Sequence, residues 1–177
     1  MIRILRHFFF LAGMTFIAVA FTNAYFADQA TVNSNSFTTS RASFTDVVLN
    51  EIYANPPGSN ESNGEWVEIY NKGDWAWDAN GWRLKDASDH ILVIDSTKTG
   101  GSTVVPPHGW LVINRNGDPN FSLNNGAETV YLIRPDGVAD TFSYTTTTED
   151  KSWARRPDGV GPWFGNQTPT PGGTNGP

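Results

Sequence analysis

The segment Glu65-Trp-Val-Glu-Ile-Tyr-Asn71 alternates apolar and polar side chains, which is typical of a β-strand. The two-residue period of a strand places Val67 and Ile69 on one face, with Trp66 and Glu68 on the other. We therefore expect Val67 and Ile69 to point into the core.

Further segments on both sides of this strand show the same character and are separated by Gly, Pro, Asn and Asp. These segments are residues 47–53, 82–84, 90–94, 110–113, 129–133 and 138–144. In Arg134-Pro-Asp-Gly137 the fixed φ of proline and the freedom of glycine favour a tight turn. About seven short strands without a helical period predict an all-β fold, either a sandwich or a barrel.

The first of these strands is irregular, because Leu49 and Ile52 have opposite parity and cannot both face the core of a regular strand. Two arrangements are open. Either a β-bulge lies near Asn50-Glu51, or one of the two apolar side chains is exposed.

The composition excludes several classes of function. The 177 residues include no cysteine, which excludes a disulfide framework, cysteine-based zinc sites and thiol catalysis. The chain has 12 Lys+Arg and 18 Asp+Glu; leaving out Arg3 and Arg6 of the expected leader gives 10 − 18 = −8. This acidic balance argues against binding to nucleic acid.

The N-terminus is typical of a secretory signal peptide. Arg3 and Arg6 precede an apolar run over residues 8–21, and small side chains follow at Thr22 and Ala24. The run is shorter than the roughly 20 residues that a membrane span needs. We expect cleavage near Ala24 and no membrane span afterwards; the alternative is an uncleaved anchor.

These features predict three parts: a signal peptide over residues 1–24, a flexible Ser/Thr/Asn-rich spacer over 25–43, and one domain over 44–177. The stretch Asn23-Ala-Tyr-Phe-Ala-Asp28, followed by Asn35-Ser-Phe-Thr38, resembles the leader of camelysin-like and biofilm-fibre secreted proteins. That resemblance implies export, with the protein secreted or held at the cell surface.

Within the expected domain, several short motifs occur in a fixed order. They are Leu49-Asn-Glu-Ile52, Glu65 to Asn71, Asp78-Ala-Asn-Gly-Trp-Arg-Leu84, Val105-Pro-Pro-His-Gly-Trp-Leu-Val112, Asn125-Gly126 before Val130-Tyr-Leu132, Asp136-Gly137 leading to Asp140, Ser152 with Arg155, and Thr170-Pro-Gly172 with Asn175. This ordered set resembles the lamin tail domain family in its secreted prokaryotic type. No coiled-coil heptads precede it, so a filament protein of the animal lamin kind is not expected.

The resemblance implies an immunoglobulin-like β-sandwich that serves as a non-catalytic module. It also implies a structural role for the residues at the motif positions: Glu51, Glu65, Trp66, Glu68, Asn71, Gly81, Trp82, Gly109, Arg155, Pro171, Gly172 and Asn175. The sequence departs from the family at Ala79, where a larger aliphatic residue is usual, and Trp75 or Trp77 would fill the gap.

Catalytic chemistry has few candidates. His90 and His108 are the only histidines after the leader, and no Gly-x-Ser-x-Gly motif accompanies them, so we expect surface histidines. Glu51 and Glu68 could act as the carboxyl pair of a hydrolase. The alternative is that Glu51, Glu65 and Glu68 support the sandwich by bonding loop amides or an arginine such as Arg83.

Metal and cofactor sites are not expected. Asp86-Ala-Ser-Asp89 and Asn114-Arg-Asn-Gly-Asp118 offer loop oxygens, yet neither follows the order of a calcium-binding loop. The Arg155-Arg156 pair between two tryptophans is expected to form ion pairs with Glu149, Asp150 or Asp158 and to stack on a tryptophan.

Seven tryptophans form a large aromatic load for one domain. Trp66, Trp82 and Trp110 lie on expected strands, where core or sheet-covering roles are favoured. Trp75 and Trp77 have equal parity, so an extended backbone would place them on one face. They either contact a ligand or cover the gap at Ala79.

The leading hypothesis is a secreted or cell-surface binding or adhesion module without catalytic activity, whose ligand is an extracellular protein or a polysaccharide. Two alternatives remain open. One is a structural subunit of extracellular matrix that assembles through exposed strand edges. The other is the hydrolase that would use Glu51 and Glu68.

Overall fold

The structure of the chain, a computed structural model, describes residues 31–32, 35–36, 46–58 and 61–177. The expected signal peptide, its cleavage site and most of the expected spacer lie outside these residues. The chain divides into two compact units, residues 1–41 and residues 42–177. In the first unit, β1 (Thr31–Val32) pairs with β2 (Asn35–Ser36) in antiparallel fashion.

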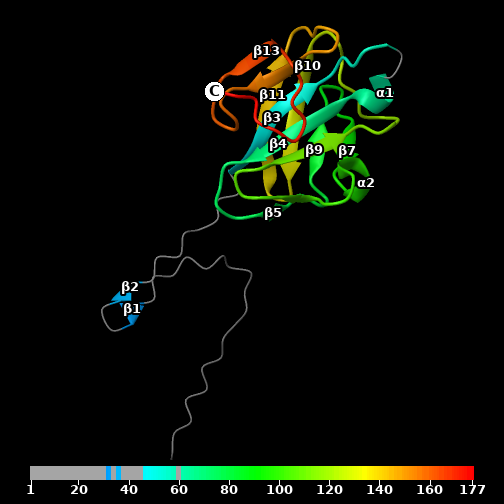
Figure 1. The fold of residues 1–177 in the computed structure, drawn as a ribbon. Helices are drawn as coiled ribbons and strands as arrows, with labels where there is room; N and C mark the ends of the chain where they lie inside the picture. Colours follow the sequence, from blue (N-terminus) through cyan, green and yellow to red (C-terminus); the bar gives the residue numbers. More distant parts are fainter. Residues whose placement is uncertain (1–30, 33–34, 37–45, 59–60) are drawn as a thin grey trace, which may run out of the picture. The chain divides into compact units, whose positions relative to one another are not determined.

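The second unit is an immunoglobulin-like β-sandwich of antiparallel strands, as the sequence resemblance implies (Figure 1). One sheet has the order β13-β12-β3-β4-β9. Its strands are β3 (Val47–Tyr53), β4 (Trp66–Asn71), β9 (Trp110–Asn114), β12 (Ser152–Arg155) and β13 (Trp163–Gln167). The other sheet has the order β11-β10-β6-β7. Its strands are β6 (Arg83–Lys85), β7 (Ile91–Val93), β10 (Glu128–Arg134) and β11 (Gly137–Tyr144).

Small elements complete this unit. The strands β5 (Trp77–Asp78) and β8 (Val104–Val105) form a two-stranded ribbon, and the helices α1 (Glu61–Gly64) and α2 (Ser96–Thr99) are single turns. Within the residues that the structure describes, no helix has the length and apolar character needed to cross a membrane.

The core lies between the two large sheets and draws on alternate residues of their strands. Val67 and Ile69 of β4 are fully buried there, as the two-residue period predicts, and Leu84 and Leu132 enter from the other sheet. Trp82 is only 5% exposed. The prediction of a buried Trp82 is therefore confirmed.

The irregularity of β3 is a β-bulge. Leu49 lies opposite Ile69 and Glu51 lies opposite Glu68, so Asn50 is the additional residue on the β3 side. The bulge changes the parity of the strand, and Leu49 and Ile52 are both buried in consequence. Of the two arrangements that the sequence left open, the bulge is the one that forms.

The strands β12 and β13 were not among the expected strands. They join the five-stranded sheet next to β3 and are fixed by aromatic contacts with β11. The Phe142 and Trp163 rings stack with centroids 3.8 Å apart, and the Phe142 and Trp153 centroids are 5.6 Å apart. The C-terminal part is therefore integral to the sandwich.

Candidate functional site

Glu51 of β3 and Glu68 of β4 lie directly opposite each other in the five-stranded sheet. Both side chains are fully buried, with 0% exposure. Strand alternation turns Glu68 away from the face that carries Val67 and Ile69, so the pair occupies the outer face of the sheet. Side chains on the outer face of a sheet are buried only where another segment covers them. Residues 168–177 cover this pair, and we refer to them as the C-terminal strap.

The strap donates hydrogen bonds to both carboxyl groups. Thr170 donates its backbone N–H to the Glu51 carboxyl at 3.2 Å and its hydroxyl at 3.0 Å. Gly172 donates its N–H to Glu68 Oε2 at 2.7 Å. From the sheet itself, Ser152 donates its hydroxyl to Glu51 at 2.5 Å. Figure 1 shows the red C-terminal segment crossing the sheet at β3 and β4.

A third carboxylate, that of Asp158 in the loop between β12 and β13, anchors the end of the strap. Its oxygens accept hydrogen bonds from the Thr174 hydroxyl at 2.7 Å and from the Asn175 N–H at 3.2 Å. Asn50, the bulge residue, donates its side-chain amide to Asp158 at 2.9 Å and to Glu68 at 3.0 Å. The bulge therefore connects the acidic residues beneath the strap.

Burial decides the protonation of this pair. The pKa of Glu68 is raised to about 8, chiefly by desolvation; the hydrogen bonds from Asn50 and Gly172 lower it, and the negative charges of Glu51 and Asp158 raise it. Desolvation also raises the pKa of Glu51. Among the described residues, no Lys or Arg forms a salt bridge with Glu51, Glu68 or Asp158.

The expectation that these glutamates bond loop amides agrees with the contacts of Glu51 and Glu68, but the suggested arginine was wrong. Arg83 is exposed on the other sheet, and Glu65 pairs instead with Arg115 at 3.1 Å. The second oxygen of Glu65 accepts the N–H of Leu123 at 3.0 Å. Glu65 thus ties two loops to the start of β4.

The other polar motif residue of β4 shapes the loop that follows the strand. Asn71 donates its side-chain amide to the carbonyl oxygens of Trp75, at 2.7 Å, and Pro106, at 3.1 Å. Its own side-chain oxygen accepts the N–H of Gly73 at 3.0 Å. Asn71 therefore fixes the backbone on which Trp75 is presented.

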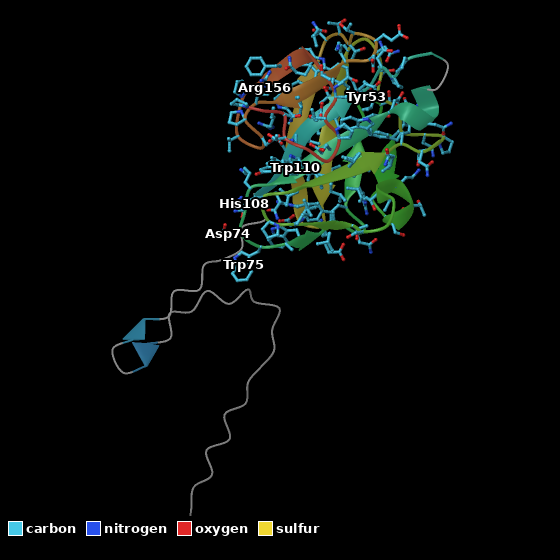
Figure 2. All side chains as sticks on the ribbon, viewed as in Figure 1. Tyr53, Asp74, Trp75, His108, Trp110 and Arg156 are labelled. Atoms are coloured by element: carbon cyan, nitrogen blue, oxygen red, sulfur yellow. The ribbon has the colours of Figure 1, made fainter. Side chains whose placement is uncertain are left out.

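The two tryptophans of this loop have different environments. Trp75 is 57% exposed, whereas Trp77 is half-buried and packs against the core cluster that contains Ala79. Beside Trp75, the Asp74 carboxylate lies 2.9 Å from His108 Nε2. Figure 2 shows Trp75, Asp74 and His108 at the same end of the sandwich.

All seven tryptophans fall within the residues that the structure describes, and Trp75 is the only one in an exposed position. Trp66 is buried, and Trp110 is half-buried beside Tyr70, with ring centroids 5.5 Å apart. Ligand contact through Trp75 and Trp77 stays a prediction, and the burial of Trp77 leaves Trp75 as the accessible ring.

The arginine pair near the C-terminus has partners other than those expected. Arg155 forms an ion pair with Asp140 at 2.9 Å and lies over the Trp163 ring, 5.0 Å from its centroid. Arg156 donates to the Gln167 side chain at 2.9 Å. Stacking on a tryptophan is confirmed, whereas the expected ion pairs with Glu149, Asp150 or Asp158 were wrong.

His90 and His108 lie on the surface, as expected. His90 contacts Asp86 at 3.1 Å, and the carboxylate of Asp86 also accepts the N–H groups of Ser88 and His90 at 2.9 Å. These bonds engage both oxygens of Asp86, one of the loop residues considered above for calcium binding. In the described part of the chain, no three acidic or histidine side chains are grouped in a way that could hold a metal ion.

Comparison with known proteins adds one finding. The family model described as Lamin Tail Domain matches residues 40–146. No curated protein and no solved structure matches the chain. The matched region includes Glu51, Glu68 and Trp75 but ends before β12, so the strap lies beyond it.

Proposed function

The chain belongs to the lamin tail domain family, and from this premise we propose that it is an exported, non-catalytic binding module that acts at the cell surface or in extracellular material. Its fold is an immunoglobulin-like sandwich, an architecture that supports many functions. The function must therefore be argued from the surface that the loops present.

Burial argues against the hydrolase alternative. A general acid or base must reach its substrate within hydrogen-bond distance. Glu51 and Glu68 are covered by the strap, and their oxygens are engaged by Ser152, Thr170 and Gly172. The pair fits the requirements of a structural anchor better than those of a catalytic dyad.

The observation that carries the proposal is the exposed ring of Trp75. A tryptophan buries a large apolar area and supplies much of the binding energy where it occurs in an interface. The fold already holds six other tryptophans in buried or half-buried positions. The Trp75 ring is exposed, and its backbone is held by the hydrogen bond from Asn71. A ligand that contacts the ring therefore has less backbone freedom to restrict on binding.

Polar groups beside the ring complete the site. The Asp74 carboxylate and the His108 imidazole are both exposed and can exchange hydrogen bonds with a ligand. An aromatic face flanked by such groups suits a sugar ring of an extracellular polysaccharide, and equally a surface loop of a protein. The proposed contact site is therefore the Trp75, Asp74 and His108 end of the sandwich.

The test is capture of extracellular polysaccharides and surface proteins by the purified protein. We expect Trp75→Ala to weaken capture by at least tenfold without changing the melting temperature. Phe164→Ala is the matched control, because Phe164 is also an exposed aromatic residue, 46% exposed, and lies on β13. Equal capture by both variants and the unaltered protein would refute this contact site.

A second candidate is the structural matrix subunit, and the edge strand β7 favours it. Ile91 and Val93 are exposed on β7, which among the described strands pairs with β6 alone. Exposed apolar edge strands can pair with a second chain. Assembly that grows with protein concentration and is lost in Val93→Lys would support this candidate; a monomer at all concentrations would exclude it.

A further inference from the structure

The C-terminal strap is attached in an unusual way. Residues 168–177 consist of Thr, Pro, Gly and Asn, so they bring no large apolar side chain to the sheet. They form no strand and no helix. Hydrophobic burial and backbone pairing therefore contribute little to holding the strap in place. Its attachment depends on one hydrogen bond to a backbone carbonyl, from the Asn175 side-chain amide to Asn50 at 3.3 Å, and on several hydrogen bonds to side chains.

The side-chain acceptors of those bonds are carboxyl groups from three separate elements. They are Glu51 on β3, Glu68 on β4 and Asp158 in the loop after β12. The other titratable groups packed nearby are Tyr70, whose pKa is raised by burial and by the Asp158 charge, and Lys72, which lies with Tyr70 against Gly159. Arg156 lies beside Gly176 at the far end of the strap.

We propose that the C-terminal strap is a pH-responsive cover, which stays closed over Glu51 and Glu68 while the pair holds a proton and is released when both carboxyl groups are ionised. Release hydrates the carboxylates and uncovers the outer face of β3 and β4. The strap thereby couples the protonation of a buried pair to the accessibility of one sheet face.

The direction of the effect follows from proton linkage. Under the closed strap, burial raises the pKa of Glu68 from 4.5 to about 8. With the strap open, the carboxyl group is hydrated and its pKa returns toward the ordinary value. The closed state thus binds the proton more tightly, and its stability is full below about pH 4.5 and is lost as pH rises toward about 8.

The opposite pH dependence would follow if the strength of the strap's hydrogen bonds outweighed the cost of burying the charged carboxylates. Ionised carboxylates accept stronger hydrogen bonds than neutral carboxyl groups do. In that case the bonds from Thr170 and Gly172 would strengthen as pH rises, and the strap would be better protected at pH 8 than at pH 5. The sign of the pH dependence therefore separates the two explanations.

The experiment is amide hydrogen exchange of the full chain by NMR, corrected for the intrinsic effect of pH. We expect the protection of the Gly172 N–H to fall by at least tenfold between pH 5 and pH 8 and to level off above pH 8. The Ile94 N–H, which donates to the Trp82 carbonyl next to the paired strands β6 and β7, is the internal control and should keep its protection. Constant or increasing protection at Gly172 would overturn the proposal.

Two variants test the cause. Glu68→Gln cannot ionise and should reduce the fall at Gly172 to less than threefold, whereas Glu149→Gln, an exposed carboxyl that accepts the N–H of Gly58, should leave it unchanged. A full tenfold fall in Glu68→Gln would contradict the assignment to Glu68.

A second pair of variants applies even if Glu68→Gln does not fold. Gly172 has a φ of +73° and open space around its Cβ position, so Gly172→Ala strains the closed strap without touching a carboxyl group. Gly173→Ala is the matched control, since its Cβ would be in ordinary contact 3.6 Å from Thr170 O. Carbon NMR should find a lower pKa for Glu68 in Gly172→Ala only; an unchanged pKa there would refute the coupling.

Discussion

The guanidinium of Arg155 lies 2.9 Å from Asp140 Oδ2, and the same oxygen accepts the N–H of Leu49 at 3.0 Å. Arg155 also donates to the Leu49 carbonyl at 2.8 Å. These bonds join β11 of one sheet to β12 and to the bulged strand β3 of the other. Asp140 and Arg155 thus close the side of the sandwich where the bulge lies.

Asp140→Asn should therefore destabilise the domain. Both side chains of the ion pair are 17% exposed, so the change leaves the charge of Arg155 poorly compensated. We expect a loss of about 2–4 kcal/mol in the free energy of unfolding, measured by urea denaturation. Asp89→Asn is the control: Asp89 is 81% exposed beside Lys85, and such a surface pair contributes about 0–1 kcal/mol. Equal losses in the two variants would contradict the role of Asp140.

Trp82→Ala should be among the most damaging single changes. Trp82 is buried in the core, and Arg134 lies over its ring, 5.9 Å from the centroid. Truncation of such a side chain costs about 3–5 kcal/mol. Trp75→Ala removes an exposed ring and should leave the denaturation midpoint nearly unchanged. An unchanged midpoint in Trp82→Ala would remove its core assignment.

Sequence patterns within single strands were enough to predict which side chains of β4 face the core and where β3 is irregular. The period of two located Val67 and Ile69 in the core, and the parity conflict between Leu49 and Ile52 indicated the bulge. Both signals are contained within a few residues of one strand. The resemblance then supplied the immunoglobulin-like arrangement, which periodicity alone left open between sandwich and barrel.

The C-terminal part was harder to predict because its contacts are long-range. The sequence of β13 contains Gly165 and does not alternate apolar and polar residues. It forms a strand because it pairs with β12. Likewise, Glu51 contacts Thr170 across 119 positions of sequence. Residue types alone suggested candidate partners for Arg155 and Glu65, but only the fold places Asp140 and Arg115 beside them.

The proposed export of the protein predicts a processed N-terminus. The apolar run over residues 8–21 is too short to span a bilayer and is followed by Thr22-Asn-Ala24. N-terminal sequencing of exported protein should therefore start near Tyr25 or Phe26. A chain that begins at Met1 would indicate the uncleaved anchor instead.

Thermal stability should not depend on calcium. Asp86 uses its oxygens for backbone amides, and Asp118 accepts the N–H groups of Asn120 and Phe121. A ligand present at 100 times its dissociation constant adds about 2.7 kcal/mol to the native state. Melting curves with calcium and with a chelator should coincide, and a large upward shift with calcium would reveal a site that these loops do not display.

Variants of Trp77 and Ala79 test whether the Trp77 indole fills the volume that the small side chain of Ala79 leaves in the core. Trp77 packs against the core, and Ala79 is fully buried within it. If the indole fills volume that a larger residue at position 79 would otherwise take, Trp77→Ala should cost about 2–4 kcal/mol, somewhat below the value for a fully buried tryptophan. Ala79→Leu alone should also destabilise, by about 1–3 kcal/mol, because it overpacks a filled site.

The double variant decides the question. Trp77→Ala combined with Ala79→Leu should be more stable than Trp77→Ala alone, since the leucine occupies space that the indole vacates, and the two changes are close enough to couple. Urea denaturation of the four proteins gives the coupling energy. If the losses of unfolding free energy in the two single variants simply add in the double variant, Trp77 covers a different part of the core and does not fill the space beside Ala79.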